Sequence, residues 1–227
     1  RAFETQISSR NLMSMDVDND GDEDVLGWDG QSILWYENRG LDGFNFSAID
    51  TNLHVRDAST GDLNNDGNLD VLVAVAVWGT NTDQILWYEN SGNQDFAKRI
   101  IPIPSGNPTY RLKSTDFDGD GDIDILGLET HHDRIVLYRN NGEQVFEYEV
   151  LSEGVAFNPI GIDVHDIDQD GDLDLAILYT GSGEKSGGLS WFENISGEFT
   201  EHRLQVAIRD FNDDYFSSVD IADLNSD

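Results

Sequence analysis

Short apolar runs separated by polar turns dominate the pattern along the chain. The run Val71–Trp78 is apolar at every position, and the runs at 33–36 and 85–88 are apolar on consecutive rather than alternate positions. A strand that is covered on both faces has this pattern, because neither face meets water. Helical periodicity and helix N-caps before long apolar faces are missing. The pattern therefore predicts a protein built from β-strands.

Two phrases recur along the chain with a period of about 50 residues. The acidic phrase DVDNDGDED begins at Asp16; its later copies begin at 62, 116 and 166, and a shortened copy occupies 223–227. The apolar phrase ILWYEN and its variants stand at 33–38, 85–90, 135–140 and 189–194. Each apolar phrase is followed by a glycine-containing turn and then by a strand that begins with Phe.

Each unit therefore contains four strands, with the acidic phrase between the first and the second. Four strands in a repeat of this length are typical of a β-propeller blade, in which each sheet lies between its neighbours. We predict an all-β protein in which 1–227 is a single β-propeller, or part of one, with four-stranded antiparallel blades. The blades are expected at 8–52, 53–104, 105–153 and 154–207, with partial blades at 1–7 and 208–227.

The acidic phrase follows the pattern Asp-x-Asp/Asn-x-Asp-Gly-x-x-Asp. Oxygen atoms at alternate positions around a sharp turn suit a hard cation, and the glycine permits the backbone to fold back. Ca²⁺ is favoured over Mg²⁺, which keeps its waters. We predict about four Ca²⁺ ions, held by the side chains at positions 1, 3, 5 and 9 and the carbonyl at position 7. These residues are Asp16, Asp18, Asp20, Asp22 and Asp24; Asp62, Asn64, Asp66, Asn68 and Asp70; Asp116, Asp118, Asp120, Asp122 and Asp124; and Asp166, Asp168, Asp170, Asp172 and Asp174.

Two other kinds of loop could account for the acidic phrase. An EF-hand loop opens in the same way, but it needs a bidentate acid at position 12 and flanking helices. Position 12 is here occupied by Gly27, Val73, Gly127 and Ile177, and strands follow each loop. A solvated acidic turn is the second alternative, and four copies with glycine in register argue against it.

Composition narrows the classes of partner. The formal charge is −32, with 13 basic residues spread thinly, which argues against nucleic acid and against anionic membrane surfaces. The absence of cysteine excludes disulfides and thiolate metal sites. No apolar run reaches the length of a membrane span. No signal peptide is recognised, and because the chain begins at Arg1 we expect that an N-terminal segment has been removed or is not included.

The acidic loops and their period resemble the FG-GAP/VCBS repeat family, whose repeats also build the propeller of integrin α-subunits. The literal FG…GAP string is absent, so the chain is similar to the bacterial-type variant. The resemblance implies a β-propeller with Ca²⁺ in the hairpin between the first two strands of each blade. It also implies an extracellular or cell-surface location, and a role in adhesion, in carbohydrate binding or beside an enzyme.

The blade topology separates the metal loops from a second set of loops. The connections between the second and third strands, and between blades, lie on the face opposite the acidic loops, and variable loops on a rigid scaffold are where binding usually resides. The ligand-binding residues predicted there are Trp28, Trp78, His131, His132, Tyr179, Arg56, Tyr110 and Arg111. Packing at the blade edge is the alternative role for each aromatic residue. A transition-metal role for the adjacent histidines is disfavoured, because neighbours on a strand point to opposite faces.

The motifs of nucleophilic and zinc hydrolases and the phosphate-binding loop are absent. The sequence therefore predicts a binding or adhesion module for a carbohydrate or protein ligand, with no nucleic acid and no membrane insertion. Two alternatives stay open: a propeller-fold polysaccharide lyase that uses His131, His132, Tyr110 or Arg111, or its accessory domain, and a purely structural spacer. Further blades or domains of a longer chain are possible partners. The sequons at Asn45 and Asn194 matter only in a eukaryotic host.

Overall fold

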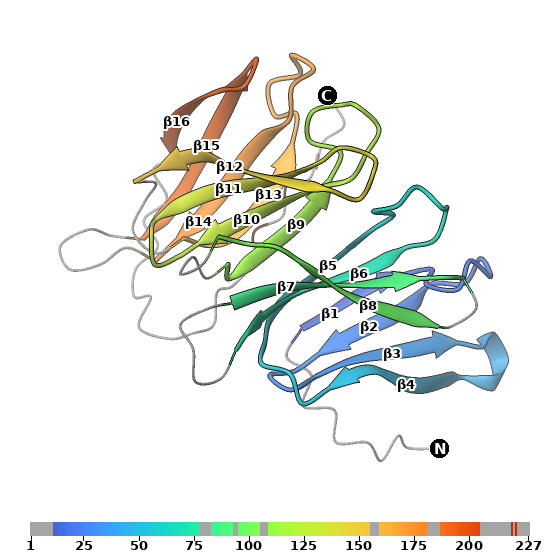
Figure 1. The fold of residues 1–227 in the computed structure, drawn as a ribbon. Helices are drawn as coiled ribbons and strands as arrows, with labels where there is room; N and C mark the ends of the chain where they lie inside the picture. Colours follow the sequence, from blue (N-terminus) through green and yellow to red (C-terminus); the bar gives the residue numbers. More distant parts are fainter. Residues whose placement is uncertain are drawn as a thin grey trace.

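The computed structural model describes residues 11–77, 83–92, 95–104, 109–154, 159–180 and 187–204, together with 219 and 221. Within these residues sixteen strands form four antiparallel sheets of four strands, and the helical element is the single turn η1 (Gly40–Asp42). This architecture confirms the predicted all-β class with four-stranded blades (Figure 1). Among the described residues no helix is long and apolar enough to cross a membrane.

Each sheet is a meander of four strands that are consecutive in the chain, and we refer to the sheets as blades 1 to 4. Blade 1 contains β1 (Asn11–Met15), β2 (Asp24–Trp28), β3 (Ser32–Asn38) and β4 (Phe44–Thr51). Blade 2 contains β5 (Val55–Gly61), β6 (Asp70–Ala76), β7 (Asp83–Asn90) and β8 (Phe96–Ile101). Blade 3 contains β9 (Arg111–Thr115), β10 (Asp124–Glu129), β11 (Arg134–Asn140) and β12 (Phe146–Glu153). Blade 4 contains β13 (Pro159–His165), β14 (Asp174–Tyr179), β15 (Gly188–Ile195) and β16 (Glu198–Leu204).

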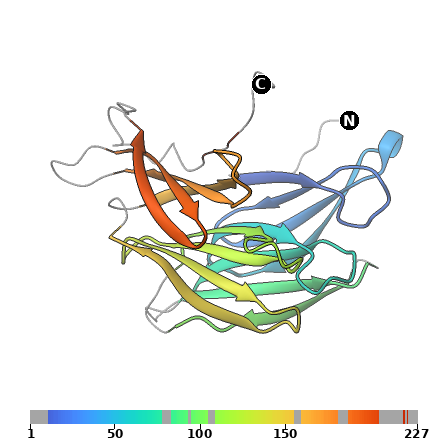
Figure 2. The same cartoon turned by 90° about the horizontal axis from the view of Figure 1, so that it is seen from above.

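The blades follow one another around a common centre (Figure 2). Their first strands are the inner ones: β5 contacts β9, and β9 contacts β13. A cavity of about 810 Å³ lies between these inner strands and is lined by residues of β1, β5, β9 and β13. The two ends of every strand therefore point to opposite faces of the molecule.

The hydrophobic core consists of three clusters, one at each junction between successive blades. Strand β6 shows why the apolar residues run consecutively. Val71, Val73 and Val75 join the cluster with blade 1, whereas Leu72 and Ala74 join the cluster with blade 3. Alternate side chains of a strand leave opposite faces, so a sheet between two others buries both sets.

Aromatic pairs repeat across the junctions. Trp35 of blade 1 meets Phe96 of blade 2 edge to face, with ring centroids 6.3 Å apart. Trp87 of blade 2 meets Phe146 of blade 3 at the same centroid distance of 6.3 Å. Trp35, Trp87, Phe96 and Phe146 are therefore packing residues between blades. Trp191 stacks on His202 within blade 4 instead, at 4.7 Å.

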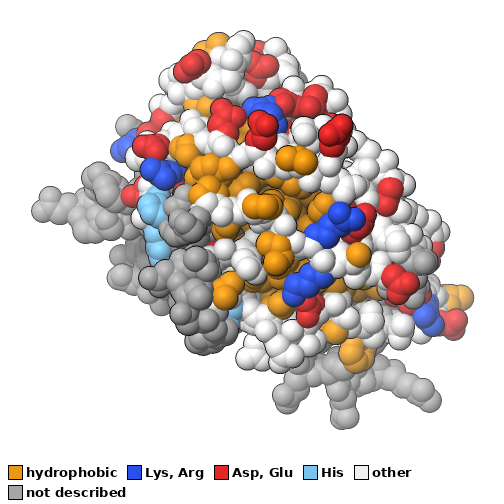
Figure 3. All heavy atoms as spheres, viewed as in Figure 1, with side chains coloured by type: hydrophobic (Ala, Val, Ile, Leu, Met, Phe, Trp, Pro, Cys, Tyr) orange, Lys and Arg blue, Asp and Glu red, His pale blue; other side chains and the backbone are white. Residues whose placement is uncertain are grey.

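Apolar side chains also reach the outer surface (Figure 3). Ile100 and Val145 are about half exposed, and they border a groove of about 390 Å³ between blades 2 and 3. Arg99 lies along this groove and donates to Gln144 Oε1 at 3.0 Å. The groove is therefore part of the contact between neighbouring blades.

Candidate metal centres

Each complete acidic phrase forms the turn between the first and second strands of a blade, as the sequence predicts. The turn folds around the aspartate at position 1. In the first loop the backbone N–H groups of Asp20 and Gly21 donate to the two carboxylate oxygens of Asp16, at 3.1 and 2.9 Å. Gly21 has φ +92°, a conformation that disfavours any residue with a Cβ. The glycine N–H makes the same bond to position 1 in the other three loops.

The aspartate at position 9 is fully buried in every loop. Asp124, for example, accepts from the backbone N–H of Phe117 at 3.1 Å and of Asn140 at 2.7 Å. Asp24 accepts the equivalent bonds and a third from Trp35 Nε1 at 2.9 Å. The final asparagine of each apolar phrase thus holds the position-9 carboxylate, a role that sequence reasoning missed. The sequence carries no signal for this bond, because the asparagine makes it through its backbone N–H, which any residue but proline could supply.

Carboxylates from positions 1, 3 and 9 converge in three of the loops, with one oxygen from each residue within 4.8 Å of the others. These groups are Asp16, Asp18 and Asp24; Asp116, Asp118 and Asp124; and Asp166, Asp168 and Asp174. The second loop supplies Asp62 and Asp70 with the amide of Asn64 at position 3. Within the described chain, Asp18 Oδ1 and Asp116 Oδ1 are buried without a hydrogen-bond donor. Clustered hard oxygens with unused lone pairs fit a divalent cation such as Ca²⁺.

Burial and mutual repulsion both disfavour the ionised form of these carboxylates. Desolvation, followed by the neighbouring charges of Asp24 and Asp20, raises the pKa of Asp18. Desolvation raises the pKa of Asp70 and of Asp124 to about 6. A bound cation would oppose both effects, so these groups could hold one.

The aspartates at position 5 lie outside these converging groups. Asp20, Asp66, Asp120 and Asp170 are exposed. Each accepts a hydrogen bond of 2.9 Å from the backbone N–H at position 7. Their predicted role as ligands stays a prediction, as does that of the position-7 carbonyls.

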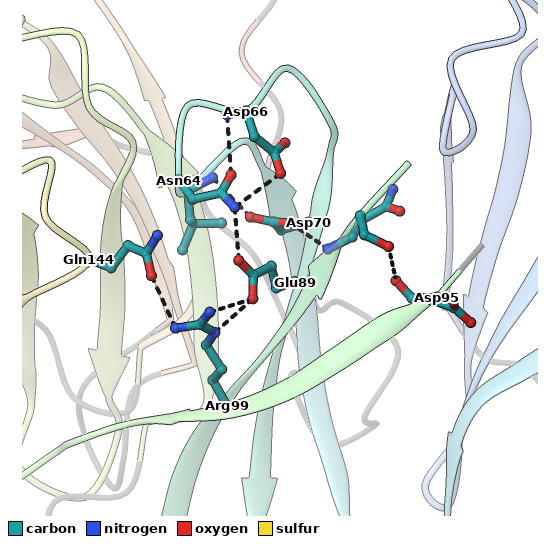
Figure 4. Close-up of polar contacts among 10 residues, drawn as sticks. Asn64, Asp66, Asp70, Glu89, Asp95, Arg99 and Gln144 are labelled. Carbon is teal, nitrogen blue, oxygen red and sulfur yellow. Dashed lines mark hydrogen bonds and ion pairs between the residues drawn. The ribbon is translucent and has the colours of Figure 1, made fainter. Parts of the chain in front are cut away.

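The second loop is braced by a polar network that reaches blade 3 (Figure 4). Asn64 Nδ2 donates to Asp66 Oδ2 and to Glu89 Oε1, both at 3.1 Å. Glu89 accepts in turn from Arg99 Nε at 2.8 Å, and Arg99 Nη1 reaches Gln144. The third strand and the fourth strand of the blade therefore fix the position-3 residue of this loop.

Neighbouring loops are also bonded to each other. Asn19 of the first loop donates to the carbonyl of Gly67 at 3.1 Å and to Asn68 Oδ1 at 2.9 Å. Asn65, which has the equivalent position in the second loop, donates to Asp122 Oδ1 of the third loop at 2.5 Å. The third loop has Gly119 at this position and so has no side chain to offer the fourth.

On the opposite face the structure brings three of the predicted ligand-binding residues together. Arg56 Nε pairs with Asp83 Oδ2 at 2.8 Å, and its guanidinium carbon lies 3.9 Å from the centroid of the Tyr110 ring. The Tyr110 hydroxyl is 3.0 Å from His131 Nε2. Arg111, next to Tyr110, donates to the carbonyls of Ile160 and Tyr110 at 2.7 and 3.1 Å. We call Arg56, Asp83, Tyr110 and His131 the loop-face cluster.

The other predicted residues of this face are placed differently. Trp28 and Tyr179 end β2 and β14 and are buried, although Trp28 also lines the central cavity with Arg56 and Arg111. His132 is exposed, with Nδ1 3.8 Å from Glu129. Trp78 lies outside the described residues. No histidine joins a metal-ligating group in the part of the chain that the structure describes.

Comparisons with known proteins agree with the repeat pattern. The model of the FG-GAP-like repeat matches three overlapping segments, at 16–73, 62–127 and 116–177. The search of curated proteins finds no match. Among solved structures, a lectin of Agrocybe aegerita, described as recognising non-reducing terminal N-acetylglucosamine, is 16% identical with a TM-score of 0.49. That alignment covers 90% of this chain and 68% of the lectin, and likeness at this level says nothing about what the chain binds. The matched segments span most of the described blades, and the chain belongs to the FG-GAP-like repeat family.

Proposed function

We propose that this chain is an extracellular calcium-binding β-propeller module that binds a carbohydrate or protein ligand on the face opposite its metal loops. The observation that carries the proposal is the loop-face cluster. Arg56, Tyr110 and His131 come from two blades and from three separate stretches of sequence, and Arg56 also lines the central cavity. Polar and aromatic groups that converge beside a cavity are the usual form of a ligand site.

The charges around this cavity favour an uncharged, hydroxyl-rich ligand. Its cationic side chains have acidic neighbours: Arg56 pairs with Asp83 at 2.8 Å, and Lys113 pairs with Asp163 at 2.6 Å. The positive charge of Arg111 acts on Asp57, which also lines the cavity. These pairs leave little net positive charge for an anion, whereas the hydroxyl of Tyr110 and the ring of His131 offer hydrogen bonds. Sugars are bound in this way, by polar groups beside an aromatic ring.

Calcium would act as a structural ion in this module. The acidic loops would hold it at the opposite ends of the strands, through the aspartates at positions 1, 3 and 9. An ion that binds only the folded chain stabilises it by mass action. The extracellular location rests on the family resemblance and on the need for a medium with enough free calcium to fill the loops.

A glycan array probed with the calcium-loaded protein tests the binding proposal. We expect hits that are lost in the variants Tyr110→Ala and His131→Ala. His165→Ala is the matched control, because His165 is exposed at the metal-loop end of β13 and its loss should leave binding unchanged. A blank array, together with no capture of peptides by the loaded protein, would favour a structural spacer instead.

The hydrogen bond between Tyr110 and His131 favours one second candidate, a polysaccharide lyase. A tyrosine and a histidine 3.0 Å apart could together remove and deliver a proton. Incubation with acidic polysaccharides separates the two functions. New unsaturated ends, absent with His131→Ala, would establish the lyase; bound and unchanged polysaccharide would establish the binding module.

A further inference from the structure

Blade 3 differs from the other blades at one position beside its metal loop. The apolar phrase ends in Glu-Asn in blades 1, 2 and 4, where the glutamates are Glu37, Glu89 and Glu193, whereas blade 3 has Arg139. In blades 2 and 3 the side chain at this position contacts the third residue of the acidic loop. Glu89 accepts from Asn64 at 3.1 Å, and Arg139 forms an ion pair with Asp118. Blade 3 therefore has a cation where its neighbours have a carboxylate.

Blades 2 and 3 each have an ion pair between the third and fourth strands. The positive and negative residues of this pair have exchanged strands in blade 3. In blade 2, Glu89 of β7 pairs with Arg99 of β8 at 2.6 Å. In blade 3, Arg139 of β11 pairs with Glu149 of β12 at 3.2 Å, at the matching register of the ladder. The exchange moves the positive charge from the outer strand to the strand that borders the acidic loop.

This charge changes what Asp118 can offer a metal. Asp118 Oδ2 accepts from Arg139, and Oδ1 accepts from the backbone N–H of Asp120 at 3.3 Å. In blade 1 the aspartate at the same loop position is Asp18, and its Oδ1 is buried with no hydrogen-bond donor among the described residues. The oxygens of Asp118 lie in a group whose ligand atoms are within 4.8 Å of one another, so an ion bound there would also be close to the guanidinium.

We propose that Arg139 makes the third loop the weakest of the four calcium sites, because its guanidinium neutralises Asp118 and repels the incoming ion. This inference rests on the calcium binding proposed above. Loops 1 and 4 have aspartate at every ligand position and a glutamate beside them, so they fill first. Loop 2 has Asn64 in place of one aspartate and has no cation bonded to its position-3 residue. Its calcium affinity therefore lies between that of loops 1 and 4 and that of loop 3.

The double variant Arg139→Glu/Glu149→Arg tests the proposal, because it reproduces the arrangement of blade 2 without changing net charge. Calcium is titrated calorimetrically into protein stripped with EDTA. The variant Asp116→Asn should lose the binding step of the third loop, which identifies that step in the titration. We expect the dissociation constant of that step to fall about tenfold in the double variant, as removal of one like charge a few ångströms from the ion predicts. Arg139→Gln should give a smaller gain in affinity, since it removes the cation without supplying a carboxylate.

Arg99→Gln is the control, because it removes a cation from the outer strand of blade 2 and should leave the third-loop step unchanged. A third-loop step that stays the same in both Arg139 variants would overturn the inference while leaving the calcium proposal intact. If the double variant does not fold, by circular dichroism, Arg139→Gln alone decides in the same way. Native protein that binds no calcium would instead refute the proposed calcium function, and this inference with it.

Discussion

Asn19 donates its side-chain amide at 2.9 Å to Oδ1 of Asn68, a residue 49 positions later in the chain, and so joins two acidic loops. The same residue also reaches the carbonyl of Gly67, at 3.1 Å. Asn19 has φ +58°, a left-handed conformation that asparagine tolerates better than most residues. Successive acidic loops are therefore linked directly, and not only through the blades beneath them.

Loss of this link should weaken the junction between blades 1 and 2. We expect Asn19→Ala to lower the free energy of unfolding by about 1 to 2 kcal/mol, because two exposed hydrogen bonds are lost and alanine is strained at positive φ. Denaturant unfolding followed by tryptophan fluorescence measures the change. Gln169→Ala is the control, because Gln169 has the same loop position and φ +64° but no hydrogen bond to a neighbouring loop among the described residues. Equal effects in the two variants would show that backbone strain, and not the link, is responsible.

The aspartates at positions 9 and 5 of a loop should respond differently to substitution. Asp124→Asn places an amide donor against the backbone N–H of Phe117 or Asn140, in a site that is fully buried. We expect a loss of about 2 to 4 kcal/mol even with EDTA present, since a buried donor loses its acceptor. Asp120→Asn, at the exposed position, should leave the metal-free stability within about 0.5 kcal/mol of native. Comparable losses in EDTA would contradict the structural role of position 9.

Stability should depend on pH in opposite directions with and without calcium. Desolvation raises the pKa of Asp57, Asp70 and Asp124 to about 6, from an ordinary value of 3.8. In the metal-free protein the folded state keeps protons that the unfolded chain releases, so the free energy of unfolding falls as pH rises from about 4 to about 6. The proposed calcium binding would need ionised Asp70 and Asp124, so it should strengthen over the same range. Thermal melts across this window, in calcium and in EDTA, should give slopes of opposite sign; parallel slopes would exclude these aspartates as ligands.

The aromatic pairs between blades should contribute strongly to stability. Phe146→Ala removes the ring that meets Trp87 of the neighbouring blade, and we expect a loss of about 2 to 4 kcal/mol. Phe46→Ala is the matched control, because Phe46 is 57% exposed and should cost less than about 1 kcal/mol. Chemical denaturation of both variants measures the difference. A small loss for Phe146→Ala would mean that blade 3 does not rely on this contact.

The two sequons should differ if the chain is secreted from a eukaryotic host. Asn45 is exposed on β4, whereas Asn194 is buried and donates through Nδ2 to the carbonyl of Leu173 at 3.0 Å. A glycan on Asn194 would break this bond and the packing around it, so we expect modification at Asn45 alone. Peptide mass spectrometry of the secreted protein measures the occupancy of both. Substantial glycan on Asn194 in folded protein would contradict the buried placement.

The repeats made much of this structure predictable from the sequence. Because the acidic phrase recurs at the same place in four units, its position between the first and second strands could be predicted. The consecutive apolar residues in Val71–Val75 predicted a sheet that is covered on both faces. The bonds from the final asparagine of each apolar phrase to the position-9 aspartate could not be predicted, because they join residues through the curvature of the turn. The burial of Trp28 and Tyr179 was equally hidden, since it depends on how far β2 and β14 continue before the chain leaves the sheet.

Calorimetric titration of calcium into the EDTA-stripped protein tests the central claim most directly. The four loops predict saturable binding of about four Ca²⁺ ions, with the aspartates of each converging group required for one of them. Asp16→Asn/Asp18→Asn should remove one ion, since both belong to a single loop. Four ions in the native protein and three in this variant would establish the loops as calcium sites. A titration without binding heat, in protein whose melting temperature is the same in calcium and in EDTA, would contradict the account.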